Sequence, residues 1–396
     1  MGIIAKNLKI IFYITLVVFV IDFFTNTLVI DNHDWDCKNY ISIAKYGFKA
    51  FPLLSPFAYR FGTPFMASAI NAMTGFSLYW CFKIIAYIGV IFQLFSLNLL
   101  ISSVIKPNRC LYLVILITAF SIANVKAMLF DVYRADHLSY GIILIQCYVC
   151  WRRRYLILLI LTIIGLQYRE FTIVPLIAYI FCALKQDWMK FITFKYLVLT
   201  FFCLFFGIMV PRVLIPVTGS VQYIEFSLSG IKRAFTVLLN LKRDFNYIYS
   251  FLAYILPILM LASFIDLKKS FSSFSKDIRR FLGCYILFVM ILTLFGGTDL
   301  IRFISYLFVP QCLILARIMT KKSFINVVLV LFMMSIFNRI WWFVPIWDYE
   351  KYLDFFGGYD SRLNLNSLCR ALELIFFIAI GFLIRYFNVV YSREKI

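Results

Sequence analysis

Long apolar runs separated by short polar connectors extend along the whole chain. Twelve such runs lie near residues 10–30, 76–105, 110–130, 138–151, 155–168, 171–184, 196–217, 246–265, 281–296, 303–319, 324–344 and 368–388. A helix needs roughly 20 residues to cross a hydrocarbon core about 30 Å thick. The pattern therefore predicts an all-α polytopic membrane protein with about twelve crossings. Because the runs at 138–151, 155–168 and 171–184 are short, the expected range is eleven to thirteen.

The composition and the distribution of charge agree with this prediction. Hydrophobic residues make up 63% of the chain, far above the usage of soluble proteins, and the net charge is +20. With the N-terminus in the cytoplasm, the inner connectors hold 21 Lys and Arg against four acids, and the outer segments hold 16 against 13. This asymmetry predicts that both termini are cytoplasmic. Because the inner positive charges are scattered over short connectors, nucleic-acid binding is disfavoured.

The whole chain, 1–396, is expected to form one transmembrane domain. Its longer polar segments are 31–75, which includes the first outer loop, and the outer loops 218–245 and 345–367. Two lysines fall within predicted spans, Lys83 and Lys126, and both are expected to extend toward the surface.

Four titratable residues follow the first run directly: Asp31, His33, Asp34 and Asp36. A carboxylate beside a low-dielectric boundary has a raised pKa, which suits a general base. The alternative is that these acids only solvate a helix end. Asp34 and Asp36 also form an Asp-x-Asp pair, a pattern that can hold a divalent cation. A cation at this pair is therefore an alternative, although no cofactor is expected.

The rest of the first outer loop predicts interfacial structure. Apolar residues recur at helical spacing between Asn39 and Gly47, which indicates an interfacial helix. Residues 52–64 are broken by prolines and predict a re-entrant or juxtamembrane element carrying Arg60. A guanidinium at membrane depth needs an anionic partner.

Three later outer connectors also combine arginine with acid. They contain Asp131, Arg134 and Asp136; Arg169 and Glu170; and Asp299 and Arg302. One interpretation is local ion pairing at helix ends, which contributes little. The other is that these three arginines and Arg60 together bind the phosphate of a lipid-linked substrate. The two histidines, His33 and His137, form a metal site only if the fold brings them together.

The first outer loop resembles that of the membrane glycosyltransferases of the C superfamily, which use polyprenyl-phosphate sugars. The resemblance rests on Asp36-x-x-x-Tyr40, on the continuation YISIAKYGF and on SPFAYRFGTPF, and it covers about the first 70 residues. In that family the loop runs Asp, three residues, Tyr, then a helix ending near Gly. The elements QYREF and GTDLIRF, followed by Pro175 and Pro310, are similar to polar elements of bacterial members. The chain departs from many members in lacking a large soluble outer domain.

The resemblance implies an inverting sugar transfer on the outer face of a bacterial inner membrane. Asp36, or its neighbour Asp34, would be the general base, and no metal is required. Arg60, Arg134, Arg169 and Arg302 would hold the donor phosphate; Tyr40, Asp131, Asp136, Glu170 and Asp299 would support the site or the acceptor. The implied partners are a polyprenyl-phosphate sugar, a glycan or lipid-linked acceptor, and the bilayer.

Two other functions remain open from the sequence. An O-antigen-type polymerase or ligase also acts on lipid-linked sugars, but it depends on arginines and a large outer loop more than on a first-loop acid. A flippase for a lipid-linked oligosaccharide fits twelve crossings with both ends inside. Transporters of this kind usually show repeats and broken polar helices, which are not evident here.

Overall fold

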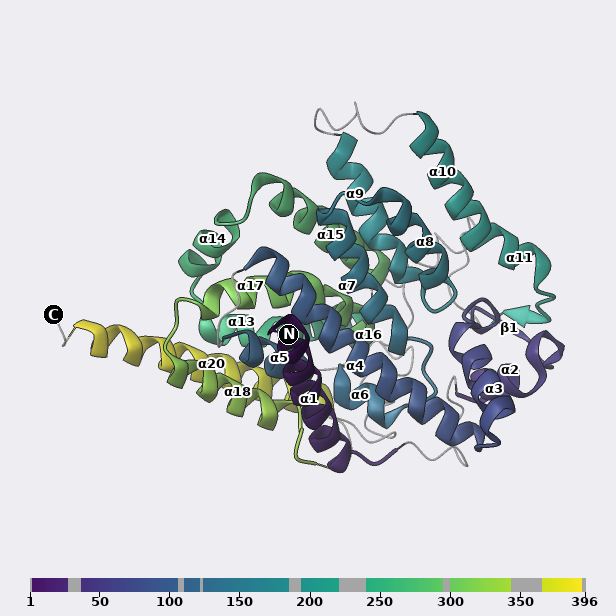
Figure 1. The fold of residues 1–396 in the computed structure, drawn as a ribbon. Helices are drawn as coiled ribbons and strands as arrows, with labels where there is room; N and C mark the ends of the chain where they lie inside the picture. The colour runs from purple at the N-terminus through teal and green to yellow at the C-terminus, as the bar shows by residue number, and fades with distance from the viewer. Residues whose placement is uncertain are drawn as a thin grey trace.

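The structure is a computed structural model that describes residues 2–27, 37–105, 110–121, 124–184, 194–220, 240–294, 300–342 and 365–393. Within these ranges the fold is almost entirely helical, and the only strands are β1 (Leu54–Ser55) and β2 (Gly219–Ser220). The predicted all-α class is therefore confirmed for the described residues. The arrangement of the helices is shown in Figure 1.

The helices are, in chain order, α1 (Gly2–Phe23), α2 (Cys37–Tyr46), η1 (Gly47–Lys49), η2 (Phe57–Tyr59), α3 (Gly62–Thr74), α4 (Leu78–Val104), α5 (Cys110–Ala119), α6 (Val125–Phe130), α7 (His137–Trp151), α8 (Tyr155–Leu166), η3 (Glu170–Ile173), α9 (Val174–Leu184), α10 (Phe194–Leu204), the π-helical turn η5 (Phe205–Met209), α11 (Val210–Leu214), α13 (Leu241–Leu261), α14 (Phe264–Ser272), α15 (Lys276–Leu294), α16 (Leu300–Ile304), η6 (Ser305–Leu307), α17 (Phe308–Met319), α18 (Phe324–Phe337) and α20 (Leu365–Arg393).

Five stretches of helix in the described part of the chain are long and apolar enough to cross a membrane. They are Leu78–Val104, Leu197–Leu214, Lys242–Leu261, Leu300–Met319 and Leu365–Phe387. The three runs expected to be short do form short apolar helices, as does Phe324–Phe337. The run at 110–130 is not one helix, because α5 ends at Ala119 and α6 begins at Val125. The chain thus has the build of a helical membrane protein.

A helix is present where the sequence predicts one between Asn39 and Gly47: it is α2. Its buried residues recur every three or four positions, at Cys37, Tyr40, Ile43 and Ala44. Gly47 follows with a φ of +59°, a conformation that glycine adopts without strain. Residues 52–64 form β1, η2 and the start of α3. We call residues 37–77 the first-loop unit; they pack on a hydrophobic core that is distinct from the main core of the bundle.

A short clasp joins the first-loop unit to the end of α11. Strand β1 pairs in parallel with β2, with Leu54 opposite Gly219. The Leu53 amide donates to Thr218 Oγ1 at 2.8 Å, and the Thr218 amide donates to the Leu53 carbonyl at 2.9 Å. Since α11 ends one of the stretches that are long and apolar enough to cross a membrane, the clasp holds the first-loop unit beside that end. Figure 1 shows α2, α3 and β1 gathered at the right, beside α11.

Lys126 does not extend to the surface, contrary to the expectation from its position in an apolar run. Its side chain is buried, and Nζ donates to the carbonyls of Phe24 (2.8 Å), Ile340 (3.0 Å) and Trp342. These carbonyls follow α1 and α18. The ammonium therefore ties three parts of the bundle together through all three of its hydrogens.

Helices α4 and α7 approach each other closely at Gly89. A Cβ placed on Gly89 would lie 2.7 Å from the backbone carbon and oxygen of His137. Backbone atoms at the start of a packed helix cannot move aside cheaply. Gly89 therefore allows α4 to lie directly against the N-terminal turn of α7, next to the polar cluster described below.

Replacing Gly89 by alanine is expected to lower the free energy of unfolding by about 1–3 kcal/mol, as overpacking does, despite alanine's better helix propensity. Gly283→Ala is the matched control, because a Cβ there meets nothing within 4 Å. Titration with SDS in mixed micelles measures both variants. Equal effects at the two positions would show that the contact with His137 is unimportant.

Candidate anion-binding site

Most of the polar residues singled out in the sequence lie in short segments between helices. Arg60 follows η2, Asp131 and Arg134 lie between α6 and α7, and Arg169 precedes η3. Asp136 precedes α7, Glu170 begins η3, Arg302 is in α16 and Tyr40 is in α2. Asp34, Asp36 and Asp299 lie outside the described residues.

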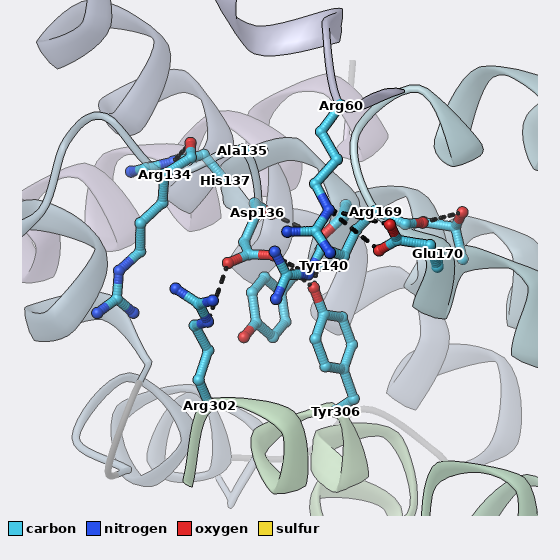
Figure 2. A network of polar contacts seen from close by, with 12 residues as sticks. Arg60, Arg134, Ala135, Asp136, His137, Tyr140, Arg169, Glu170, Arg302 and Tyr306 are labelled. Carbon is cyan, nitrogen blue, oxygen red and sulfur yellow. Dashed lines mark hydrogen bonds and ion pairs between the residues drawn. The ribbon is translucent and has the colours of Figure 1, made fainter. Parts of the chain in front are cut away.

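The four arginines gather around one carboxylate, Asp136. Arg169 Nε lies 2.9 Å from Asp136 Oδ1, and Arg302 Nε lies 3.7 Å from Oδ2. Figure 2 shows Arg60 and Arg134 on either side of this group. Asp136 is at the N-cap position of α7, but its side chain makes no cap hydrogen bond there. It turns instead toward guanidinium groups from two other connectors.

The charge of Asp136 is fixed by its surroundings. Burial alone raises the pKa of its carboxyl group. The positive charges of the surrounding arginines, Arg169 first and then Arg302, outweigh burial and hold that pKa well below its usual value. Asp136 is therefore ionised at neutral pH, and a carboxylate held in this way is a weak proton acceptor. It is suited to orienting arginines, not to acting as a general base.

Arg169 has unused hydrogen-bonding capacity although only 1% of its side chain is exposed. The N–H of Nε is not directed at Asp136, so that contact is an ion pair without a hydrogen bond. Neither Nε nor Nη2 has an acceptor among the described residues, and Asp136 Oδ2 likewise accepts no hydrogen bond there. Buried donors without acceptors are costly, and they are expected where a ligand supplies the acceptor.

Arg60 and Glu170 form the second ion pair of the cluster, across 110 residues of sequence. Arg60 Nε donates to Glu170 Oε1 at 3.0 Å and to Oε2 at 3.2 Å. Tyr40 of α2 also hydrogen-bonds this guanidinium. Burial lowers the pKa of Arg60, but Glu170 and Tyr40 outweigh it and the net pKa is raised. The contact with Tyr40 connects α2 to the arginine cluster.

Local pairing explains one of the two arginine–acid connectors that the structure describes in full; Asp299 of the third lies outside the described residues. Arg134 Nε does pair with Asp131 Oδ2 at 3.0 Å, three residues away. Arg169 and Glu170 are adjacent in sequence but pair with Asp136 and Arg60. The connectors therefore meet in space, and the local interpretation is wrong for QYREF.

His137 is not placed to bind a metal. Its Nδ1 lies 2.6 Å from the Arg134 carbonyl oxygen, and its Nε2 lies 2.9 Å from the Met128 carbonyl oxygen. Both ring nitrogens of this buried side chain therefore face backbone acceptors. His33, its proposed partner in the sequence, lies outside the described residues.

An aromatic stack that sequence reasoning missed supports the cluster from below. The rings of Phe303, Phe171, Tyr306 and Tyr140 lie nearly parallel in a row, with centroid separations of 5.6, 4.4 and 4.6 Å. The hydroxyl of Tyr306 donates to Asp136 Oδ1 at 3.0 Å (Figure 2). At the other end, the guanidinium carbons of Arg169 and Arg302 lie 5.3 and 5.7 Å from the Phe303 ring centroid.

The sequence contains one signal for this stack. Phe171 and Phe303 each follow an arginine of the cluster by one or two residues, in QYREF and GTDLIRF. Rings in these positions can carry the guanidinium planes by cation–π contact. Nothing in the sequence links Tyr140 or Tyr306 to Asp136.

No protein-family model and no curated protein matches this chain.

The arginines therefore form a preorganised group of guanidinium donors at one end of the bundle. Carboxylates orient Arg60 and Arg169. The Phe303 ring lies against the guanidinium groups of Arg169 and Arg302. Arg169 retains unsatisfied donors. Guanidinium groups bind phosphate and carboxylate with two parallel hydrogen bonds. Within the described residues, the arrangement is suited to binding an anionic group and to stabilising negative charge as it develops.

Proposed function

We propose that this chain is a membrane glycosyltransferase that takes a sugar from a polyprenyl-phosphate donor. The observation that supports this is the grouping of Arg60, Arg134, Arg169 and Arg302 near one buried carboxylate, Asp136. Arg169 and Arg302 contact that carboxylate, and donors of Arg169 are left over. The site would hold the donor phosphate in the ground state and, more strongly, as charge develops on it during transfer.

The topology proposed with this function has twelve crossings and cytoplasmic termini. The arginine cluster then lies on the outer face, since the connectors rich in Lys and Arg lie at the opposite ends of the spans. In a bacterium this is the outer side of the inner membrane. A hydrophobic donor reaches such a site from within the bilayer.

The transfer step needs only a base and the phosphate site. A carboxylate of the first outer loop, Asp36 or Asp34, takes the proton of the acceptor hydroxyl. The acceptor oxygen forms a bond to the anomeric carbon, and the bond from that carbon to the phosphate oxygen breaks with inversion. The electron pair stays on the lipid phosphate, whose charge the arginines hold. Since the pKa of Asp136 is lowered, the base is assigned to the first loop and not to Asp136.

An O-antigen-type polymerase or ligase is the second candidate. One observation favours it: the cluster in the described residues is dominated by arginines and contains no carboxylate free of arginine contact. Such an enzyme also acts on lipid-linked sugars, and it depends on arginines more than on a first-loop acid. The Asp36 variant treated in the Discussion separates the two candidates.

Arg302→Ala tests the phosphate site. Its ion contact with Asp136, at 3.7 Å, is longer than that of Arg169, at 2.9 Å. We expect binding of a short-chain polyprenyl phosphate to the purified protein to weaken about tenfold to a hundredfold, the equivalent of one charged hydrogen-bonding partner.

Arg212→Ala is the matched control for this measurement. Arg212 lies over the Tyr59 ring at the same end of the bundle, 5.3 Å from its centroid, outside the cluster. Loss of affinity in Arg302→Ala with normal binding in Arg212→Ala is the expected pair of results. Wild-type affinity in Arg302→Ala would remove Arg302 from the phosphate site.

A further inference from the structure

A second group of unsatisfied donors lies at the far end of the bundle from the arginine cluster. Helix α7 starts beside Asp136 and ends 15 residues later at Trp151, which is roughly 22 Å away at 1.5 Å per residue. Trp151 packs edge-on against Phe281 near the start of α15, with ring centroids 6.3 Å apart. Arg279 and Arg280 immediately precede Phe281. These residues play no part in the proposed transfer.

Each of these three side chains has a buried nitrogen with nothing to donate to. Trp151 Nε1, Arg279 Nε and Arg280 Nη1 are shielded from solvent and have no hydrogen-bond acceptor in the described parts of the chain. The first turn of α15 contains one acid, Asp277, and no ion pair joins it to either arginine within those parts. All three atoms are donors only, so the missing partner is rich in acceptors.

A lipid-facing strip starts directly beside these donors. Along α15, Arg280 is followed at helical spacing by Gly283, Leu287 and Ile291, and the last two are exposed. A Cβ on Gly283 would meet nothing within 4 Å, so the helix surface is open there. Phe288 of α15 contacts Phe181 of α9 at 5.1 Å, and Phe181 is also exposed. Arg280 interacts electrostatically with Cys182, the residue after Phe181. The guanidinium of Arg280 therefore lies at the head of a strip of exposed apolar side chains on α15, beside the contact between α9 and α15.

We propose that this end of the bundle binds an anionic phospholipid, with the headgroup phosphate at Arg279, Arg280 and Trp151 and an acyl chain along Gly283 and Leu287. Phosphate oxygens accept from guanidinium in pairs and from an indole N–H singly, which matches the three donors. Exposed lysines of the same end, Lys268 and Lys269 of α14, add a favourable surface potential without closing the site. A soluble phosphate would leave the apolar strip of Gly283, Leu287 and Ile291 uncovered, so the lipid is the better occupant.

Thermal unfolding of the full chain in a neutral detergent tests the proposal. Added dioleoyl phosphatidylglycerol is expected to raise the Tm in a saturable way, and dioleoyl phosphatidylcholine, with the same acyl chains and no net charge, is expected to raise it less. In Arg279→Gln/Arg280→Gln the apparent affinity for phosphatidylglycerol should fall roughly tenfold or more. The matched control, Lys268→Gln/Lys269→Gln, removes the same charge nearby and should keep the response.

Gly283→Leu keeps the proposal testable if the arginine variant folds poorly. Because the position is open, leucine should leave the Tm without lipid unchanged or higher, yet it should reduce the response to phosphatidylglycerol by occupying the open space over Gly283 where the acyl chain is proposed to lie. An unchanged response in Gly283→Leu would overturn the acyl-chain assignment. Equal losses in the arginine and lysine pairs, or no shift with phosphatidylglycerol, would overturn the site. A full shift with inorganic phosphate or glycerol 3-phosphate alone would show that the ligand is a soluble phosphate and not a lipid.

Discussion

Asp136→Ala is expected to lower the free energy of unfolding by about 3–5 kcal/mol, the usual cost of removing one partner from a buried ion pair. Arg169 is almost completely buried, and Asp136 is the carboxylate nearest to its guanidinium. Without that carboxylate the charge of Arg169 is uncompensated, and the hydroxyl of Tyr306 loses one of its two hydrogen-bond partners and keeps only Ser139. Titration of the purified protein with SDS in mixed micelles measures the change.

Two further variants show whether the loss comes from the buried charge. Glu170→Ala removes a carboxylate whose side chain is 41% exposed, so water can reach its place beside Arg60 and the effect should be clearly smaller than that of Asp136→Ala. Asp136→Leu combined with Arg169→Met removes both charges and should recover most of the stability lost in Asp136→Ala. If Asp136→Ala and Glu170→Ala have equal small effects, Asp136 is not the centre of the cluster.

The same ion pair predicts a direction for pH dependence. The pKa of Asp136 is lower in the folded protein than in the unfolded chain, where it is about 4. Its contribution to stability is therefore complete above the unfolded value and is lost as the pH falls through the lowered folded value. Between neutral pH and pH 5, ionisation of Asp136 should therefore cause no change in the free energy of unfolding.

Asp36→Asn is expected to reduce sugar transfer from a polyprenyl-phosphate sugar by about 10² to 10⁴ in kcat, the usual contribution of a general base. Asparagine preserves the size of the side chain but cannot take the proton of the acceptor hydroxyl. Binding of the donor should be largely retained, because the proposed phosphate site is formed by arginines. Turnover and donor affinity are measured on the same purified protein.

Asp34→Asn is the neighbouring control, and it decides which first-loop acid is the base. A loss in only one of the two variants assigns the base to that residue. Unchanged turnover in both would remove the general-base assignment and favour the polymerase or ligase, which depends on arginines. Loss of donor binding in Asp36→Asn would instead place Asp36 in the donor site.

Local features of the fold were predictable from the sequence because they depend on neighbouring residues. The helix after Cys37 and its end at Gly47 follow from apolar spacing and one glycine, and both are present. The short helices near 138–184 follow from the lengths of the apolar runs. The break between α5 and α6 was missed, because an apolar run does not reveal where backbone hydrogen bonding stops.

The polar contacts were predictable only in part. The recurrence of arginine beside acid in the connectors predicted that these arginines act together. In the structure all four lie near Asp136. Their partners did not follow, because Arg60 pairs with a residue 110 positions away and not with a neighbour. Lys126 shows the same limit: its acceptors are backbone carbonyls more than 100 residues away, which no residue pattern marks. Pairings of this kind are set by how the helices pack.

The long sequence separations within the arginine cluster have a consequence for how the protein is made. Asp136 and Arg169 leave the ribosome close together, but Tyr306 follows Asp136 by 170 residues. At a synthesis rate of about 5–20 residues per second, this interval is on the order of ten to thirty seconds. During that time the nascent chain holds Asp136 and Arg169 without Tyr306 or Arg302. The last third of the chain therefore completes the site, and a translation product that stops before Arg302 would enter the membrane with an unfinished polar centre.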